Sequence, residues 1–327
     1  MITLGHGAGG RLSQKLVAEH FLPKLDNPAL AELGDSAVLE DIALTTDCYV
    51  VTPRFFPGGD LGRLAICGTV NDLAMVGAEP LGLTAGFIFE EGFPLEELDR
   101  LVDSAAGAAK EAGVQIVAGD TKVVPRGACD GVFVTTSGAG RVDSAFRPAA
   151  KRASAGDTVI ISGTLGDHGM AVMACREGLP IEGNLQSDVA PLIGMVRDLK
   201  AAQIEVHTLR DPTRGGVAQS LIEIANASGV RIVIDEKQLP IRPTVLAACE
   251  LLGIDPLYVA NEGKLLALVP RNQADKTLEV LNSNEWGKDA RVIGQVVDGN
   301  PGLEITTPIG ARRAVRMPSG EILPRIC

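Results

Sequence analysis

The feature that most constrains the fold is an alternation of short, β-branched apolar runs with amphipathic stretches, which recurs in both halves of the sequence. In the first half it predicts helices at residues 11–25, 60–78 and 94–113, and strands at 36–40, 42–51, 80–90, 114–121 and 131–142. In the second half it predicts helices near 167–177, 189–202, 214–228 and 243–253, and strands at 158–163, 230–235, 265–270, 290–297 and 303–306. Helices between successive strands indicate an α+β or mixed α/β architecture in each half.

A domain boundary is expected between the two halves. The segment FRPAAKRASAGD, residues 146–157, is polar, contains proline and lacks apolar periodicity. A chain of 327 residues is also long enough for two domains, at about 100–200 residues per domain. The sequence therefore predicts two domains joined at this segment.

Composition disfavours several classes of protein. The net charge of −11 argues against nucleic-acid binding, which requires Lys and Arg to neutralise phosphates. No apolar run approaches the length of a membrane span, and the opening MITLGHGAGG lacks the regions of a secretory signal. The six cysteines form no CxxC, so neither a zinc site nor a disulfide framework is predicted. A reduced, cytoplasmic protein fits these observations best.

Four aspartates stand at positions that suit a metal site. Asp47 and Asp120 interrupt apolar strand-like runs, Asp72 lies inside an apolar helix, and Asp35 lies in LGDSAV. A buried carboxylate is costly unless it is paired or binds a metal. Carboxylates without histidine or thiolate partners suit Mg²⁺, which keeps phosphate oxygens and water as its other ligands. Each aspartate could instead cap a helix or close a turn, but the four together favour a magnesium–phosphate site.

Two further charged residues are candidates for the same chemistry. Lys122 could project to the same face of an extended segment as Asp120 and neutralise a phosphate, although a solvated lysine is the simpler interpretation. Glu262 precedes an apolar strand, where it could accept a proton or simply hold Lys264.

Glycine-rich segments occur at the start of the chain and at residues 207–216. GHGAGG resembles a phosphate-binding loop only loosely, because no lysine follows in register. HTLRDPTRGG combines a diglycine, which lets backbone approach a ligand closely, with a helix-entry signature. A capped helix start explains much of this second motif, and His207 and His168 are expected to be structural.

The sequence ends PRIC, so its last residue, Cys327, is a thiol on a chain end. Chain ends are the least constrained part of a domain. On these residues alone a packing cysteine is the simpler interpretation, and a mobile arm that carries a nucleophile to a site elsewhere is the alternative.

Seven segments occur together, in the same order, in the HypE family of NiFe hydrogenase maturation proteins. They are HGAGG, TTDCYVV, GTVNDLAMVGA, GDTKVV, DPTRGG, NEGK and PRIC. The resemblance spans nearly the whole chain, and GTVNDLAM and PRIC are its most specific elements. It implies the two-domain, PurM/AIR-synthetase-like α+β fold of aminoimidazole ribonucleotide synthetase, selenophosphate synthetase and thiamine-monophosphate kinase.

The resemblance implies four parts in the chain. They are a glycine-rich N-terminal segment with a helix (1–34), an N-terminal domain that binds ATP and magnesium and forms a homodimer (35–148), a C-terminal α/β domain (149–316), and a mobile tail that carries the acceptor cysteine (317–327).

The activity implied is that of an ATP-dependent carbamoyl dehydratase. A carbamoyltransferase, HypF, would place a carbamoyl group on the sulfur of Cys327. ATP would phosphorylate the carbamoyl oxygen, and loss of a proton and phosphate would leave a thiocyanate. The cyano group would then pass to hydrogenase iron held by the HypC–HypD complex. A mobile chain end suits a thiol that must visit three sites.

The family roles are transferred residue by residue. The residues implied to hold Mg²⁺, and thereby the ATP phosphates, are Asp35, Asp47, Asp72 and Asp120, with Asn71 beside them. The residues implied to line the same cleft are Asp211, Thr213, Gly215 and Gly216.

The remaining roles concern the carbamoyl group itself. Lys122 and Glu262 would handle its charge and proton. From the residues themselves, Arg325 and nearby cations could lower the pKa of the Cys327 thiol, against the opposing charge of its own α-carboxylate. Cys48 stands where serine or a similar small residue is expected.

Two other functions remain open. A small-molecule kinase or synthetase of the same fold would not need Cys327. Selenophosphate synthetase would carry a reactive Cys or selenocysteine in its N-terminal loop, and GHGAGG has none. A non-catalytic scaffold would use the acidic surface and tail only to bind maturation partners, but it has no need of a magnesium–phosphate site.

Overall fold

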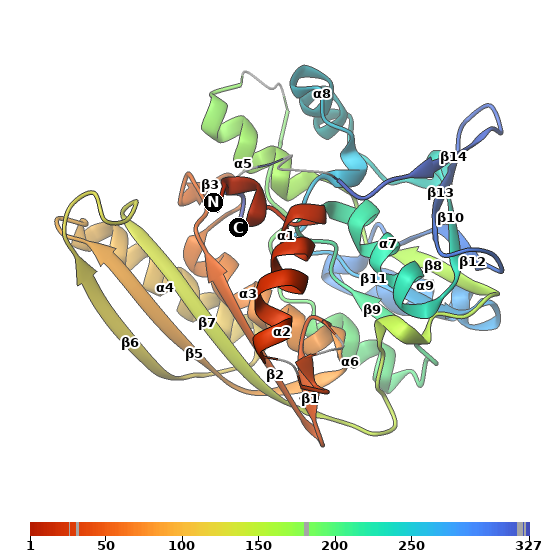
Figure 1. The fold of residues 1–327 in the computed structure, drawn as a ribbon, viewed down its shortest axis with the longest axis horizontal. Helices are drawn as coiled ribbons and strands as arrows, with labels where there is room; N and C mark the ends of the chain where they lie inside the picture. The colour runs from red at the N-terminus through yellow and green to blue at the C-terminus, as the bar shows by residue number, and fades with distance from the viewer. Residues whose placement is uncertain (26, 31–32, 180–182, 319–322, 324) are drawn as a thin grey trace.

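The computed structural model describes residues 1–25, 27–30, 33–179, 183–318, 323 and 325–327. Two sheets, each with its own helices, lie side by side in it, and the two ends of the chain meet between them (Figure 1). Among the described residues, no helix has the length and apolar character needed to cross a membrane.

The N-terminal sheet has five strands in the order β1-β2-β7-β5-β6. They are β1 (Ala37–Leu39), β2 (Ile42–Tyr49), β5 (Ala78–Glu90), β6 (Ile116–Val124) and β7 (Val132–Val142). A separate small hairpin pairs β3 (Phe55–Phe56) with β4 (Gly59–Asp60). β5 and β6 are parallel, as expected for strands joined by a helical crossover, and the other pairs are antiparallel.

Helices α3 (Leu61–Met75) and α4 (Leu95–Ala112) follow β4 and β5 and pack against each other. The side chain of Asp60 caps α3 by accepting the backbone N–H of Arg63, and α4 ends at Gly113, whose φ of 72° is left-handed. α3 contacts β2, β7 and β5, and nearly all of its residues are buried. The helix is therefore enclosed between the N-terminal sheet and the rest of the molecule.

The C-terminal sheet has seven strands in the order β14-β13-β10-β12-β8-β11-β9. They are β8 (Asp157–Ile161), β9 (Thr208–Arg210), β10 (Arg231–Asp235), β11 (Leu266–Pro270), β12 (Arg291–Val297), β13 (Gly302–Thr306) and β14 (Arg312–Val315). The helices are α5 (Asp167–Glu177), α6 (Ile193–Ala201), α7 (Gly216–Ser228), α8 (Pro243–Leu252) and α9 (Ala274–Ser283). The short 3-10 turns are η4 (Ala150–Arg152), η5 (Glu236–Gln238), η6 (Pro256–Tyr258), η7 (Arg271–Gln273) and η8 (Glu285–Gly287).

The hydrophobic core is continuous between the two sheets. Alternate residues of β8 point to opposite faces. Val159 and Ile161 pack with α7, whereas Ile160 belongs to the cluster that includes α3, α5 and α6. This shared core fixes the two halves relative to each other, so residues from both can build one site.

The N-terminal segment lies against the junction of the two halves (Figure 1). It consists of η1 (Leu4–His6), α1 (Gly10–Leu16), one π-helical turn η2 (Val17–Phe21) and α2 (Leu22–Leu25), so the helix predicted at 11–25 is confirmed. The backbone N–H of Gly10 donates to Gln219 on α7 at 2.9 Å, and that of Arg11 donates to the oxygen of Pro318 at 3.1 Å.

The α+β architecture predicted for each half is confirmed, and each predicted helix and strand has a counterpart. The structure adds α9, β9, β14 and the β3–β4 hairpin, which the sequence did not indicate. The bounds of the four predicted parts and the mobility of the tail stay predictions.

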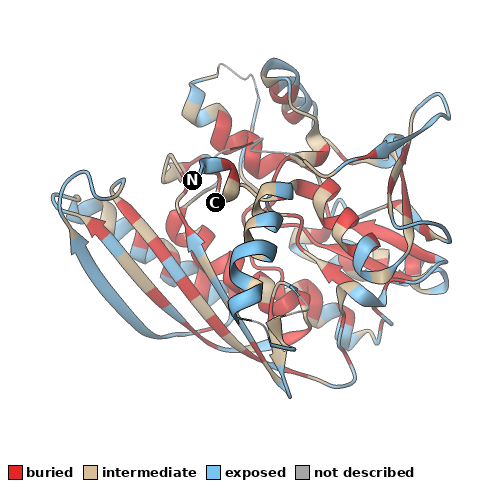
Figure 2. Cartoon of the chain, viewed as in Figure 1, coloured by how far each residue is buried: buried red, intermediate tan, exposed pale blue. Residues whose placement is uncertain are grey.

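The outer edge of the N-terminal sheet is open to solvent. β6 is the edge strand, and every residue of it except Val124 is exposed (Figure 2). Exposed apolar side chains occur on three strands of this sheet: Leu44 on β2, Leu81 and Ile88 on β5, and Ile116, Val117 and Val123 on β6. An uncovered edge with apolar neighbours is typical of a surface that meets another chain.

Candidate functional site

Three aspartates meet at the junction of the two halves. Asp35 precedes β1, Asp72 lies on α3 and Asp211 follows β9. Each offers one carboxylate oxygen, and these three oxygens lie within 4.8 Å of one another. Asp35 and Asp72 are two of the four predicted metal ligands, whereas Asp211 was predicted only to line the cleft.

Polar neighbours hold the three aspartates, which we call the acid cluster, in place. Thr45 donates its hydroxyl to Asp72 at 2.7 Å, and Arg210 pairs with Asp35 at 3.0 Å. Asp47 on β2 accepts the Thr69 hydroxyl at 3.3 Å, and its carboxyl group is within hydrogen-bonding reach of that of Asp72 when one of the two is protonated. The third predicted ligand therefore touches the cluster without belonging to it.

Burial and mutual repulsion disfavour ionisation of these acids. Burial raises the pKa of Asp35 to about 6, although Arg210 opposes the shift. Burial and then the charge of Asp35 raise the pKa of Asp211 to about 8. Burial and the charges of Asp47 and Asp211 raise the pKa of Asp72 well above its usual value. A bound cation would relieve this repulsion, and an all-carboxylate donor set fits Mg²⁺.

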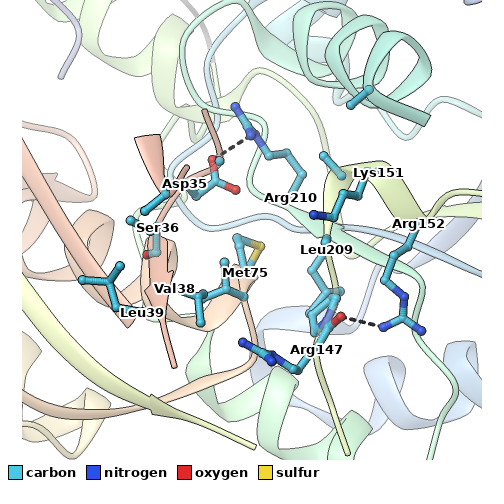
Figure 3. Close-up of a pocket in the computed structure, with 18 of the residues that line it drawn as sticks. Asp35, Ser36, Val38, Leu39, Met75, Arg147, Lys151, Arg152, Leu209 and Arg210 are labelled. Carbon is cyan, nitrogen blue, oxygen red and sulfur yellow. Dashed lines mark hydrogen bonds and ion pairs between the residues drawn. The ribbon is translucent and has the colours of Figure 1, made fainter. Parts of the chain in front are cut away.

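A cavity of about 1090 Å³ lies next to the cluster, with Asp35 in its wall. It is formed between β1, the end of α3 and the segment that joins the two domains. Three side chains of that segment, Arg147, Lys151 and Arg152, line it together with Arg210 (Figure 3). The cavity therefore combines carboxylate and cationic walls with apolar ones from Val38, Met75 and Leu209.

The end of the chain lies inside this junction. The backbone N–H groups of Val50 and Thr52 donate to main-chain oxygens of Cys327 and Arg325, each at 3.1 Å. This antiparallel pattern continues β2 and places the tail alongside it. Ile326 is 3% exposed, so the tail is packed as well as hydrogen-bonded.

The thiol of Cys327 lies close to three charged groups. Burial raises its pKa to about 11, Arg214 opposes this shift, and Glu262 and Asp47 add to it. The prediction that Arg325 lowers this pKa is wrong for the observed position. The Arg325 guanidinium pairs instead with Asp130 at 2.7 Å and donates from Nε to the oxygen of Val50 at 2.9 Å.

Glu262 is held from its backbone. Its N–H donates to the Asp188 carboxylate at 3.1 Å, and its oxygen accepts from Ala190 N–H at 3.3 Å. The next residue explains the glycine of NEGK, since a Cβ at Gly263 would lie 1.7 Å from the oxygen of Asp188. Burial, followed by repulsion from Asp211, raises the pKa of Glu262 well above its usual value. Lys264 pairs with Asp188 at 3.1 Å rather than with Glu262.

Asn71 was predicted to lie beside the metal ligands and to bind the cofactor, and in the structure its side chain is hydrogen-bonded to backbone groups of the C-terminal half. Its amide nitrogen donates to the oxygens of Ala190 at 3.1 Å and Glu262 at 3.4 Å, and its amide oxygen accepts the N–H of Leu192 at 2.7 Å. These bonds engage both ends of a side chain that is 1% exposed. Asn71 therefore joins α3 to the backbone around Glu262.

The DPTRGG loop places its residues at the same junction. Thr213 donates its N–H to the oxygen of Asp211 at 3.0 Å, so the loop turns directly after the acid cluster. Gly215 and Gly216, with φ of 79° and 60°, begin α7. A Cβ at Gly216 would lie 2.5 Å from the oxygen of Leu257, so the close approach requires glycine.

Asp120 and Lys122 do not join the acid cluster within the described chain. From Asp47 on β2, the strand register runs across β7 and β5 to Gly119 on β6, a distance of about 14 Å at about 4.8 Å per strand. Asp120 is the next residue, so it projects from the opposite face. It pairs with Lys122 at 2.6 Å, as expected for two residues on one face of a strand, and both are exposed.

Two residues of the site were not singled out from the sequence. Arg214 donates to the oxygen of Gly7 at 2.8 Å, and its charge acts on Cys327, Asp47 and Glu262. Tyr49 is 5% exposed and its hydroxyl is bonded to Asp47. The arginine stands within the DPTRGG motif, but its spacing alone suggests a helix start. From the sequence pattern alone, Tyr49 is indistinguishable from a core residue of a strand.

The fold and this junction define the class to which the chain belongs. Residues 33–142 match the family model for the N-terminal domain of AIR synthase related proteins, and residues 154–305 match the model for the C-terminal domain. The predicted PurM/AIR-synthetase-like fold is thereby confirmed.

Relatives with high sequence identity show to which family within this class the chain belongs. The whole chain is 49% identical to carbamoyl dehydratase HypE of Cupriavidus necator, over 95% of that protein. The crystal structure of a HypE–HypF complex contains a chain 51% identical, with a TM-score of 0.89, covering 93% of this chain and 99% of that one. HypE in complex with ATP is 44% identical, with a TM-score of 0.85, over 99% of this chain and 100% of that one. The chain therefore belongs to the HypE family of hydrogenase maturation proteins.

Proposed function

We propose that this chain catalyses the ATP-dependent dehydration of an S-carbamoyl group on Cys327 to a thiocyanate, which supplies the cyanide ligands of hydrogenase iron. One observation supports this function most strongly. The Cys327 thiol lies within charge range of Glu262, Arg214 and Asp47, and Asp47 is bonded to the acid cluster. A group carried on this sulfur would thus meet an acid, a cation and the phosphate site together.

The reaction balances without a redox step. The carbamoyl oxygen of Cys327–S–C(=O)–NH₂ attacks the γ-phosphorus of ATP, and ADP leaves. The nitrogen then loses both of its protons as the C–O bond breaks and phosphate departs. The product is Cys327–S–C≡N, and the oxygen of the formal water leaves in phosphate.

The residues around the thiol suit these two steps. A glutamate with a raised pKa is a suitable proton acceptor near neutral pH, and Glu262 is such a residue. The Arg214 guanidinium is placed to stabilise negative charge that develops on the carbamoyl oxygen. Tyr49, bonded to Asp47, orients that carboxylate toward the same place.

The phosphates of ATP would bind at the acid cluster. Asp35, Asp72 and Asp211, with Asp47 beside them, would hold Mg²⁺, which neutralises phosphate charge and polarises the γ-phosphoryl group. The neighbouring cavity would accept the nucleoside, because its wall carries Arg147 and Arg152 and it is large enough for a drug-sized ligand. The solved complex of a related HypE with ATP supports the binding of ATP itself.

The observed position of the tail indicates that carbamoylation and dehydration take place with the Cys327 thiol at two different locations. A thiol with a pKa of about 11 is a poor nucleophile at neutral pH, because little thiolate is present. Cys327 would therefore accept the carbamoyl group outside the site and return to it for dehydration. HypF is the proposed donor, in keeping with the HypE–HypF complex of a relative. The HypC–HypD complex is the proposed acceptor of the cyano group.

The first test is the mass of the C-terminal peptide after incubation with HypF, carbamoyl phosphate and ATP. We expect a carbamoyl adduct on Cys327 that loses one water only when ATP is present, and no adduct in Cys327→Ala. An unmodified tail, with equal ATP turnover in the alanine variant, would leave a kinase of the same fold as the better interpretation. Binding to partners without any turnover would leave a scaffold.

Asp120 and Lys122 are proposed to act in a homodimer. They lie on β6, the uncovered strand of the N-terminal sheet, and the exposed Ile88 of β5 pairs in register with Lys122 on the same face. Pairing of two copies through this surface would bury the apolar side chains and bring Asp120 and Lys122 to a second chain. Lys122 would then handle carbamoyl charge in the second copy's site.

A mixing experiment tests this arrangement. Lys122→Ala and Asp72→Asn should each be inactive alone. If one site uses Asp72 from one copy and Lys122 from the other, mixed dimers carry one intact site, and about a quarter of all sites recover activity. Light scattering on the same samples should give the mass of a dimer. A dimer whose mixture stays inactive would assign Lys122 to the site of its own chain.

A further inference from the structure

A fully buried histidine holds the residue next to Cys327. His168 lies in the first turn of α5 and is 0% exposed. Its Nε2 is 2.7 Å from the main-chain oxygen of Ile326, and its Nδ1 is 2.8 Å from Oγ of Ser187. Phe56 packs edge-on against the ring, with 5.5 Å between centroids. The imidazole is thus fixed on both nitrogens and one face.

The partners of the ring determine its tautomer. A carbonyl oxygen only accepts hydrogen bonds, so the proton between His168 and Ile326 must be on Nε2. Burial lowers the pKa of His168, so the ring is neutral and Nδ1 is an acceptor. Ser187 therefore donates to Nδ1, and its oxygen accepts the N–H of Val189 at 3.2 Å. A directed chain of hydrogen bonds leads from Val189 to the tail.

Asp188, which lies between Ser187 and Val189, holds the backbone of Glu262. Asp188 accepts the N–H of Glu262 at 3.1 Å and pairs with Lys264, also at 3.1 Å. Residues 187–189 consequently hold Glu262 directly and hold the tail through His168. One short segment therefore contacts both the backbone of Glu262 and, through His168, the residue next to Cys327.

Other tail contacts act farther from the sulfur. Arg176 donates to the oxygen of Arg325 at 2.6 Å and to that of Thr52 at 2.7 Å. Arg325 also pairs with Asp130. These bonds anchor the approach of the tail, whereas His168 holds the peptide unit that joins Ile326 to Cys327.

We propose that His168 is a positioning residue for the dehydration step, because its Nε2–H holds the Ile326 carbonyl and thereby fixes the position of Cys327 at the junction of the two halves. The role of His168 in catalysis rests on the proposed function. The effect of His168 on the tail does not, because a Cys327 thiol held in the site is shielded from reagents whatever reaction it takes part in.

The test compares His168→Leu with His168→Gln. Leucine keeps apolar bulk but removes both hydrogen bonds, whereas the glutamine amide can still donate toward Ile326. The first readout is the rate of Cys327 alkylation by iodoacetamide, followed by the mass of the C-terminal peptide. Cys48, exposed on β2, is the internal reference. We expect leucine to raise the Cys327 rate about three- to ten-fold, the effect of losing one such bond, and glutamine to keep it near wild type.

The second readout separates the two half-reactions with the full-length protein. In His168→Leu, carbamoylation by HypF should be unchanged or faster, and dehydration should be slower by a similar factor. If His168 had only a structural role, its replacement would slow both carbamoylation and dehydration. It would also lower the unfolding temperature of both the leucine and the glutamine variant. Should leucine fail to fold, Ser187→Ala, which removes the partner of Nδ1, should raise the alkylation rate in the same direction.

Two results would overturn the proposal. One is an alkylation rate of Cys327 that is the same in wild type and His168→Leu. The other is a glutamine variant that behaves like leucine. A wild-type tail that is never carbamoylated would instead count against the proposed function, and the alkylation rates would still decide the role of His168.

Discussion

Glu262→Gln is expected to accept the carbamoyl group on Cys327 and then fail to dehydrate it. Glutamine matches glutamate in size and stays neutral, so backbone bonds to Asp188 and Ala190 are kept. It removes a carboxyl group whose pKa burial raises well above its usual value and whose charge acts on the Cys327 thiol. Loss of a general base lowers rates by about 10²–10⁴-fold. The mass of the C-terminal peptide should therefore show the carbamoyl form accumulating in the presence of ATP.

A matched variant separates this effect from a general loss of negative charge. Glu111→Gln also removes one carboxylate, but Glu111 lies on α4 and pairs with Arg63 at the surface. It should dehydrate at the wild-type rate. If Glu262→Gln forms thiocyanate as fast as Glu111→Gln, another group accepts the proton and the assignment of Glu262 is wrong.

Local patterns were enough to predict most of the fold. Periodicity located helix α4, whose buried Leu101, Ala105, Ala108 and Ala112 recur at intervals of three or four residues, and strand β7, whose buried residues alternate with more exposed ones. Helix α9 was missed because its buried face contains Ala274, Thr277 and Leu281, and a threonine weakens the apolar stripe. β14 was missed because three of its four residues, including Arg312 and Arg313, are exposed and charged or small. Elements whose buried face is small or polar leave no such pattern.

The site was predicted less completely, because residue type does not reveal which acids converge. Asp120 interrupts an apolar run and Asp211 stands in a helix-entry motif, yet the fold places Asp211, and not Asp120, beside Asp35 and Asp72. Arg214 was missed for the same reason, since its partner Cys327 is distant in sequence and meets it only through the path of the tail. The PRIC motif indicated a carrier thiol, but only the hydrogen bonds to Val50 and Thr52 locate it.

The acid cluster should make the metal-free protein less stable as pH rises. An acid whose pKa is higher in the folded state stabilises folding below its unfolded pKa and loses that contribution as pH passes its folded value. The pKa of Asp35 rises from 3.8 to about 6 and that of Asp211 from 3.8 to about 8. In EDTA, the free energy of unfolding should fall between about pH 4 and 8. Asp35 alone contributes about 3 kcal/mol, at about 1.4 kcal/mol per pKa unit.

Asp72→Asn tests the cluster in both stability and catalysis. In EDTA, asparagine removes repulsion on Asp211 and Asp35, so the fall in unfolding free energy with pH should be shallower than in wild type. Mg²⁺ should restore stability at pH 8 in wild type and do so less in the variant. ATP turnover should drop about 10²–10³-fold, as when one electrostatic contact to a transition state is lost. Asp103→Asn, exposed on α4, is the control. Wild-type turnover in Asp72→Asn, with an unchanged response to Mg²⁺, would place the phosphate site away from these three aspartates.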